Sequence, residues 1–404
     1  MIQFPRVDRR RFLAQTASVA AMAAAPWVGQ AARGEEPDDA AFAPSAAAIR
    51  AHLATLLPSR DDVARWLSDQ AYPFAKYDPE LGYLHKDRDF AEGQDGAICR
   101  YRYDALDARQ MLAYADQSCR VNTYGDSFTS CEQVSDGETW QEVLARHLGE
   151  PVRNYGIGGY SVYQAYLRML REERRAPAGT IVFNIYDDDH ARNVLGWQRF
   201  KFGVYNKHIS PTIPHMALDA ESGEIVERLN PCPTPVSVAD LCDLDRAVEL
   251  FRDDFYLRNR LDWIARQAAG ETPPRTDYDD ARLMRRGIAA TTRIVDRVER
   301  FATEHDKRVL YVLSFGAYTN RQFIETGARF DQALVDFLDE RRLPYVDLMR
   351  AHAADAARFD GPADEALARY FIGHYNPLGN VFCAFAIKDA LVGMLDPKPP
   401  AYSG

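Results

Sequence analysis

The sequence of 404 residues lacks three features that each mark a whole class of protein. After the first 34 residues, no stretch is long and apolar enough to span a bilayer. No internal repeat or long low-complexity tract is present. No cluster of Lys and Arg is interleaved with aromatic residues, since the densest basic run, Arg171 to Arg175, is diluted by two glutamates. Together with a formal net charge of −10, this excludes nucleic acid as a partner.

The start of the chain has the pattern of an export signal. Arg9-Arg10-Arg11-Phe12-Leu13 is followed by an uncharged, Ala-rich run from Ala14 to Val28 and then by small residues. This pattern is typical of a twin-arginine signal peptide, which we expect over residues 1–34. A membrane anchor is the alternative, but the run contains polar residues and is shorter than the roughly 20 residues that a span needs. We therefore expect the twin-arginine export machinery as a partner, no stable membrane span, and a periplasmic or secreted location.

Cysteine is also scarce, with six residues and no CxxC or Cys/His spacing of a structural zinc site. In an exported chain disulfides are expected, although six cysteines allow fifteen pairings. Cys232 and Cys242 flank a Pro-rich loop and are the best local pair. Cys119 and Cys131 would lie roughly 14 Å apart by strand and helix rises. Because a disulfide reaches only about 7 Å, that pair is disfavoured. Cys383 is expected to be a buried small apolar residue.

Strands and helices alternate from Cys119 onward, which is typical of a parallel sheet with helices on both faces. The fold class expected is a three-layer α/β/α sandwich with a mainly parallel sheet. The strands are expected at 119–125, 152–155, 180–186, 308–314 and 344–348. The helices are expected at 137–148, 161–174, 280–304 and 320–341.

A final helix is expected to start at Pro377, because proline is favoured at the first helical position. Leu378, Val381, Phe382 and Phe385 follow at the spacing of one helix face. We expect this apolar stripe to cover the sheet.

Segments outside the alternation form additions to this main domain. An N-terminal addition without helical period precedes it, and an insertion with a Ser222-Gly223 hairpin turn interrupts it. Insertions after sheet strands fall near the ligand-binding edge of an open α/β sheet, so the insertion is expected to be a lid or cap. The expected boundaries are a linker over 35–58, the addition over 59–118, the main domain over 119–397, its insertion over 197–278, and a tail over 398–404.

Ser127 lies in Gly125-Asp126-Ser127, where a short strand ends and a helix-prone stretch begins. Such a turn lifts a serine hydroxyl above the sheet, and free N–H groups of the first helical turn can stabilise an anion beside it. The alternative is that Asp126 or Ser127 only caps the helix, since both residue types are preferred caps.

Three further motifs follow Ser127 in chain order. Asn154-Tyr-Gly-Ile-Gly-Gly-Tyr-Ser161 follows one strand, Tyr186-Asp-Asp-Asp-His190 follows the next, and Gly373-His374-Tyr-Asn-Pro377 precedes the last helix. With the Gly-Asp-Ser turn, this order resembles the SGNH, or GDSL-type, hydrolase family over residues 119–397. The resemblance implies an SGNH-like, flavodoxin-like sheet and a serine that attacks an acyl carbonyl.

The resemblance also implies roles for individual residues. Ser127 would be the nucleophile and His374 the base that removes its proton. The N–H of Ser127, Gly159 and the residue at the position of Asp188 would hold the oxyanion. These roles are chemically sensible, because a serine needs a base and preset N–H donors stabilise charge that appears only in the transition state. The alternatives are a plain tight turn at Gly158-Gly159 and a helix-entry residue at His374.

The chain departs from the family pattern beside the histidine. The family has an aspartate three residues before it, where this chain has Phe371. Either Ser127 and His374 act as a dyad, or another carboxylate orients the histidine. A missing acid would weaken catalysis rather than abolish it. The candidate acids are Asp347, Asp360, Asp364 and Glu365.

A second departure lies in the third motif, where the family's asparagine falls on Asp188, or on Asp187 if the strand is one residue shorter. An ionised carboxylate cannot donate to an oxyanion unless its pKa is raised enough to keep it protonated. Asn193 or backbone donors could take its place. The residues from Asp187 to His190 are suitable ligands for a divalent metal, but consecutive residues on a turn point different ways. We expect a solvated acidic loop, no metal and no cofactor.

The sequence therefore predicts an exported serine esterase acting on ester groups of a small molecule or glycan, with O-acetyl groups on a carbohydrate as the family-level expectation. Two alternatives stay open. The acyl-enzyme could pass its acetyl group to an exported polysaccharide, or the chain could be a non-catalytic glycan-binding protein on a degenerate scaffold.

Overall fold

Five parallel strands form the central sheet of the computed structural model, which describes residues 44–68, 74–203, 211–218, 224–272, 274 and 276–402. Their order is β11-β10-β7-β5-β6, and each neighbouring pair is parallel. The predicted sheet and all five of its strands are confirmed. The strand bounds are β5 Val121–Tyr124, β6 Arg153–Asn154, β7 Thr180–Tyr186, β10 Arg308–Ser314 and β11 Tyr345–Asp347.

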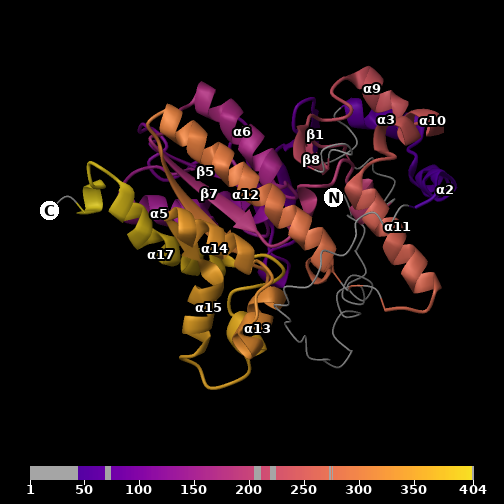
Figure 1. The fold of residues 1–404 in the computed structure, drawn as a ribbon. Coiled ribbons are helices and arrows are strands. Elements are labelled where there is room, and N and C mark those ends of the chain that lie inside the picture. Colours follow the sequence, from indigo (N-terminus) through magenta and orange to yellow (C-terminus); the bar gives the residue numbers. More distant parts are fainter. Residues whose placement is uncertain are drawn as a thin grey trace, which may run out of the picture. The chain divides into compact units, whose positions relative to one another are not determined.

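Helices cover both faces of this sheet, which makes the predicted three-layer sandwich (Figure 1). Alternate residues of β7 divide between two apolar cores: Ile181 and Phe183 face one cluster with α6 and α12, and Val182 faces another with α5 and α17. Because both faces are covered, the central strands are apolar almost throughout, as parallel strands usually are. The helix bounds are α5 Trp140–Leu148, α6 Val162–Arg175, α12 Ala281–Glu304 and α17 Pro377–Met394.

The single helix expected over 320–341 is two helices, so this prediction was wrong. α13 covers Ala317–Thr326 and α14 covers Gln332–Arg341. Gly327 ends α13 in the left-handed conformation at φ 72°. Glycine reaches this conformation without steric cost, and the helical period continues across the break, which is why the pattern looked continuous.

The last helix, α17, starts at Pro377 as predicted, but it buries a different face. Leu378 and Phe385 are each 52 % exposed, whereas Cys383, Ile387 and Leu391 are buried. The same face also carries the small buried residues Gly379 and Ala384, and the helix contacts β10, β11 and α5. The expectation that no stretch after residue 34 is long and apolar enough to span a bilayer was wrong by length and composition, because α17 passes that test in the described part of the chain. In the structure its buried face packs in the core.

The N-terminal addition contains two helices and two short hairpins. α2 covers Ala46–Leu56, so the linker expected over 35–58 ends earlier than predicted. Ser45 caps this helix by accepting a hydrogen bond from the Ala48 amide, and one helix face is buried. The remaining elements are α3 Arg60–Leu67, the antiparallel pair β1 Ala75–Asp78 and β2 Gly82–His85, and the antiparallel pair β3 Arg88–Phe90 and β4 Cys99–Tyr101.

The insertion folds into a hairpin and several helices. The Ser222-Gly223 turn lies outside the described residues, and β8 and β9 pair antiparallel on either side of it. The segment between Cys232 and Cys242, expected as a loop, contains helix α9. The bounds are α8 Arg199–Phe202, β8 His215–Leu218, β9 Ile225–Arg228, α9 Pro235–Asp240, α10 Leu244–Phe251 and α11 Phe255–Ala268.

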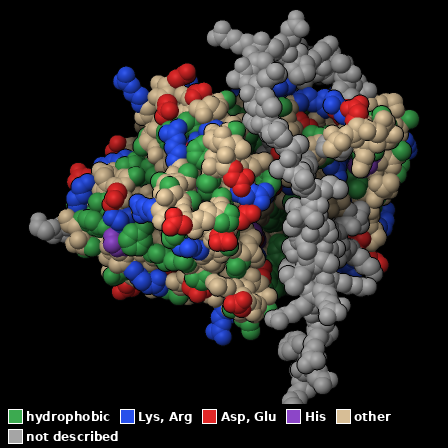
Figure 2. All heavy atoms as spheres, turned by 90° about the horizontal axis from the view of Figure 1, so that it is seen from below, with side chains coloured by type: hydrophobic (Ala, Val, Ile, Leu, Met, Phe, Trp, Pro, Cys, Tyr) green, Lys and Arg blue, Asp and Glu red, His purple; other side chains and the backbone are tan. Residues whose placement is uncertain are grey.

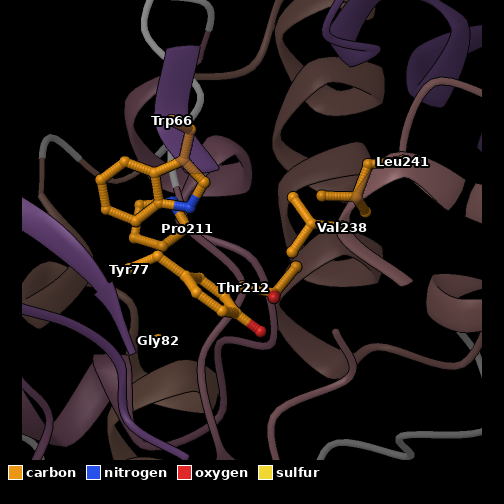
Figure 3. Close-up of a pocket in the computed structure, with 7 residues that line it drawn as sticks. All are labelled: Trp66, Tyr77, Gly82, Pro211, Thr212, Val238 and Leu241. Carbon is orange, nitrogen blue, oxygen red and sulfur yellow. The ribbon is translucent and has the colours of Figure 1, made fainter. Parts of the chain in front are cut away.

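The N-terminal addition and the insertion pack against each other, although the main-domain strands β5 to β7 separate them in the chain (Figure 1). α2 contacts α10, α3 contacts α9, and the Tyr77 hydroxyl donates to the Cys232 carbonyl at 3.0 Å. A shallow recess lies at this junction (Figure 3). Trp66, Tyr77 and Gly82 line it from the addition, and Pro211, Thr212, Val238 and Leu241 line it from the insertion.

All six cysteines are free thiols, so the expected Cys232–Cys242 disulfide is wrong. Cys232 is fully buried beside the addition. Helix α9 occupies the segment between Cys232 and Cys242, where a loop was expected. Cys119 and Cys131 are unpaired, as expected, and Cys383 is buried as predicted.

Candidate active site

The Gly125-Asp126-Ser127 turn joins β5 to the short helix α4 (Ser127–Ser130). A side chain at Gly125 would place its Cβ 2.2 Å from Thr129 Oγ1 and 2.9 Å from the Asn184 carbonyl oxygen, so only glycine fits. Asp126 is the helix cap, because its Oδ1 accepts a hydrogen bond of 2.9 Å from the Phe128 amide. The cap is therefore supplied by Asp126, which leaves the Ser127 hydroxyl available for other contacts.

His374 reaches Ser127 from the other end of the chain. Its Nε2 lies 2.8 Å from Ser127 Oγ, which is hydrogen-bond distance for a nucleophile and its base. Asn376 caps α17 by accepting from the Gly379 amide, so His374 is not the cap of that helix. The structure thus brings the two predicted catalytic residues together.

The loop that carries His374 is held by backbone and side-chain bonds. The His374 amide donates to Gln133 Oε1 at 2.6 Å, and the Ile372 amide donates to the His374 carbonyl at 2.9 Å. Gly373 has φ 130°, and a Cβ there would fall 2.8 Å from Gln133 Oε1. Gln133 therefore packs where a side chain at 373 would be, and it fixes the backbone of the histidine.

Phe371 occupies the position of the family's aspartate, and it packs into an aromatic cluster. Its ring lies 4.6 Å from Tyr375 and 5.3 Å from His352, measured between ring centroids. His352 Nε2 shares a 2.8 Å hydrogen bond with the Tyr375 hydroxyl, and burial lowers the pKa of His352 to about 3. Neutral side chains thus pack around the sequence position where the family has an aspartate.

The contacts of His374 in the described structure include none of the four candidate acids. Asp347 caps α15 (Leu348–Ala356) and pairs with Arg329 at 2.6 Å. Asp364 pairs with Arg321 at 3.3 Å, and Asp360 and Glu365 are exposed. Two of these carboxylates therefore form ion pairs with arginines, and the other two face solvent.

The nearest charged partner of His374 is Glu132, which the sequence reasoning missed. Glu132 Oε2 lies 3.9 Å from His374 Nε2. Glu132 follows the serine turn closely, because the left-handed Cys131 (φ 59°) ends α4 and the Glu132 amide donates to the Ser127 carbonyl. Its proximity to Ser127 in sequence was the available signal, but nothing in the pattern shows where the side chain points.

The glycine turn of the second motif lies against the same elements. A Cβ at Gly156 would meet the Ser130 amide at 2.1 Å, and one at Gly158 would meet Glu132 Oε1 at 1.9 Å. Gly159 has φ 79°, so a residue with a side chain would be strained there. Among the described residues, neither the Ser127 nor the Gly159 amide has an acceptor. Both N–H groups are free to bind an anion.

Asp188 does not fit the oxyanion role that the motif position assigns to it. Its carboxylate contacts Lys201 Nζ at 2.8 Å and Arg192 at 3.0 Å. Although burial alone would raise the pKa of Asp188, these two cations lower it to about 2. The group is therefore ionised and cannot donate a hydrogen bond.

The two substitutes considered for Asp188 point elsewhere. Asp187 accepts from the Gly316 amide and the Thr319 hydroxyl, and burial raises the pKa of Asp187 to about 7. The Asn193 amide group donates to the Gly287 carbonyl and to Thr291, deep in the core. The oxyanion donors that remain are backbone N–H groups.

The acidic run is a buried network rather than a solvated loop, so that expectation was wrong. Asp189 pairs with Arg192 at 2.8 Å, and burial lowers the pKa of His190, which bonds Thr291, to about 4. Arg192 also lies 3.8 Å from Asp126, whose Oδ2 is 3.1 Å from Ser127 Oγ. No group of three or more potential ligands in the described residues is arranged to hold a metal ion. The network instead ties the third motif to the serine turn.

One face of the molecule carries charge of both signs. In the coloured part of Figure 2, acidic and basic side chains are interspersed, and neither sign gathers into one large patch on that face.

No protein-family model and no curated protein matches the chain. Several solved structures are similar to it at low identity. The acetyl xylan esterase AlAXEase is 14 % identical with a TM-score of 0.35, covering 67 % of this chain and 99 % of its own. Axe2, an acetylxylan esterase from Geobacillus stearothermophilus, is 11 % identical with a TM-score of 0.36, covering 69 % and 96 %. A GDSL-like lipase from Bacteroides thetaiotaomicron VPI-5482 is 12 % identical with a TM-score of 0.33, covering 70 % and 93 %.

Proposed function

We propose that this chain is an ester hydrolase that forms an acyl-enzyme on Ser127. The observation that carries the proposal is the 2.8 Å separation of Ser127 Oγ and His374 Nε2. A serine hydroxyl is a weak nucleophile until a base within hydrogen-bond reach accepts its proton. Free amides at Ser127 and Gly159 would supply the donors that such a reaction needs.

The reaction would proceed in two halves. His374 Nε2 accepts the Ser127 proton as Oγ bonds the ester carbonyl carbon, and the carbonyl oxygen takes up the negative charge. The two backbone N–H groups stabilise that charge, each by roughly 3 kcal/mol. The carbon–oxygen bond to the alcohol then breaks, and the alcohol leaves with the proton from His374. Water repeats the sequence on the acyl-enzyme and releases the acid.

The proposed substrate is a short acyl ester, such as an O-acetyl group on a carbohydrate or polyol. Ser127 is only 5 % exposed, so little space surrounds the reacting carbon. A small acyl group fits such a site better than a long chain does. Export is also part of the proposal and rests on the twin-arginine pattern at Arg9 to Arg11, which lies outside the described residues.

The decisive experiment compares the parent protein with Ser127→Ala. We expect the parent to hydrolyse p-nitrophenyl acetate and to be labelled by a fluorophosphonate probe at Ser127. Ser127→Ala should lose the label and lower the rate by about 10⁴-fold, or to the uncatalysed rate. Equal rates for the two proteins would rule out Ser127 as the nucleophile.

The second candidate is a non-catalytic glycan-binding protein, favoured by Phe371 at the acid position and by the ionised Asp188. Absence of labelling in well-folded parent protein would support it. Transfer of the acetyl group to a glycan uses the same acyl-enzyme, and product analysis with an acyl donor and a glycan acceptor separates transfer from hydrolysis.

A further inference from the structure

Glu132 is placed so that its two carboxylate oxygens have different neighbours. Oε1 lies 3.4 Å from a guanidinium nitrogen of Arg88, and Oε2 lies 3.9 Å from His374 Nε2. Arg88 comes from β3 of the N-terminal addition, and its guanidinium stacks on the Tyr101 ring at 4.1 Å. The arginine therefore fixes one oxygen and leaves the other toward the histidine.

Gly158 provides the room for this carboxylate. A Cβ at residue 158 would lie 1.9 Å from Glu132 Oε1, so the carboxylate fills the space that a side chain would need. Gly158 does not have a left-handed φ. Outside Glu132, the nearest atom to a Cβ at this position would be His85 Cε1 at 3.3 Å. The glycine is therefore required mainly by the position of Glu132.

The proton that leaves Ser127 arrives at His374 Nε2, the nitrogen that Glu132 faces. An imidazolium formed there is stabilised by a carboxylate within about 4–6 Å. Among the described residues, Glu132 is the carboxylate found within 4 Å of this nitrogen, and Phe371 stands at the sequence position of the family's acid.

We propose that Glu132 is the positioning residue that stabilises protonated His374 during the reaction, in place of the missing acid. This inference rests on the proposed function, since it assigns Glu132 a part in the same serine-dependent reaction. The other charged groups around His374 are Asp126, next to Ser127 Oγ, and the arginines Arg88 and Arg192 that lie behind the two carboxylates. Both acids favour the imidazolium, but only Glu132 lies within ion-pair distance of the ring.

The first test replaces the charge and keeps the shape. We expect Glu132→Gln to lower kcat on p-nitrophenyl acetate about tenfold and to leave KM unchanged, because the imidazolium that forms during the reaction loses its counter-charge. Asp364→Asn is the matched control, since this exposed carboxylate pairs with Arg321 away from the site. A kcat in Glu132→Gln equal to that of the parent would overturn the inference.

A second readout does not depend on turnover. Fluorophosphonate labelling of Ser127 requires only the step in which His374 takes up the serine proton. The labelling rate should fall in Glu132→Gln and stay constant in Asp364→Asn. A parent protein that neither labels nor hydrolyses ester removes the proposed function, whereas an unchanged labelling rate in Glu132→Gln removes this inference.

A third variant displaces Glu132 without changing it. Gly158→Ala should push the carboxylate away from its place and lower the rate of Ser127 labelling, as Glu132→Gln does. In the double variant the alanine has no charge left to displace, so the labelling rate should match that of Glu132→Gln alone. A full additional drop in the double variant would contradict the assignment.

Discussion

The Tyr83 hydroxyl donates a hydrogen bond of 2.7 Å to the Gly158 carbonyl oxygen, which joins the N-terminal addition to the glycine turn of the site. Gln198 Nε2 donates to the same hydroxyl at 3.1 Å, so a residue of the insertion completes the contact. The backbone that carries the candidate oxyanion donor is thus held by two segments outside the main domain.

Removal of the Tyr83 hydroxyl should loosen this turn. We expect Tyr83→Phe to lower kcat/KM five- to tenfold and to destabilise the fold by about 1–3 kcal/mol, since the part-buried Gly158 carbonyl and the buried Gln198 lose a partner. Ester hydrolysis and denaturant unfolding measure the two effects. Tyr345→Phe removes a hydroxyl bonded to Asp339 near the opposite edge of the sheet and should leave kcat/KM unchanged.

A side chain at Gly159 should impair the site more severely. Its φ of 79° is unfavourable for alanine, and a Cβ there would lie 2.8 Å from the Tyr83 hydroxyl oxygen. We therefore expect Gly159→Ala to lower kcat/KM at least tenfold. Gly393→Ala is the matched control, because a Cβ there meets no atom within 4 Å and alanine favours the helix α17. Equal activity in the two variants would argue against Gly159 as an oxyanion donor.

Asp188 should stabilise the fold in a pH-dependent way. Its pKa of about 2 in the folded chain lies below the ordinary value of 3.8, so its contribution is full above pH 4 and is lost as the pH falls toward 2. We expect Asp188→Asn to cost about 2 kcal/mol of unfolding free energy at pH 6. The difference from the parent should shrink in denaturant titrations at lower pH, and a constant difference would contradict the pairing with Lys201 and Arg192.

The neighbouring Asp187 should have the opposite effect. Burial raises its pKa to about 7, so the folded chain keeps a proton that the unfolded chain releases between about pH 4 and 7. Stability therefore falls as the pH rises through that range. Asp187→Asn keeps an acceptor for Thr319 and Gly316 and should be more stable than the parent at pH 8, by on the order of 2 kcal/mol. A parent that is equally stable at pH 5 and 8 relative to this variant would disprove the shift.

The six free cysteines predict that reducing agents have no effect on stability. The unfolding midpoint should be the same with and without dithiothreitol, and thiol titration of the unreduced, denatured chain should find six thiols. Protein isolated from the periplasm of an expression host is the stringent sample, because that compartment promotes disulfide formation. A Cys232–Cys242 disulfide in that sample would be contrary to the structure.

The parts of the fold that depend on local pattern were predictable. The runs at 180–186 and 308–314 are mostly apolar, which is the pattern of a strand buried on both faces. The chain order of the motifs that contain Ser127, Gly159 and His374 carries the family resemblance, and that resemblance predicted that Ser127 and His374 act together. The 2.8 Å contact of Ser127 and His374 is in keeping with that prediction.

Features that depend on which face a side chain meets were not predictable. The spacing of Leu378, Val381 and Phe385 marks a helix stripe but does not show what it faces, and the structure buries the other face of the helix instead. Glu132 acquires its position from a left-handed residue and from an arginine contributed by the addition. The first is a backbone conformation and the second is a contact between residues far apart in the chain. Neither produces a periodic pattern in the sequence.

Most of the candidate site comes from one continuous stretch, since the serine turn, Glu132, Gln133 and the glycine turn all lie between β5 and the start of α6. His374 is the exception, and it reaches the serine only when the loop before α17 is seated. The other parts of the site come from residues that precede β10 in the chain, whereas the base comes from the segment beside α17. Reactivity of Ser127 toward an activity probe therefore reports whether α17 and the loop before it are docked.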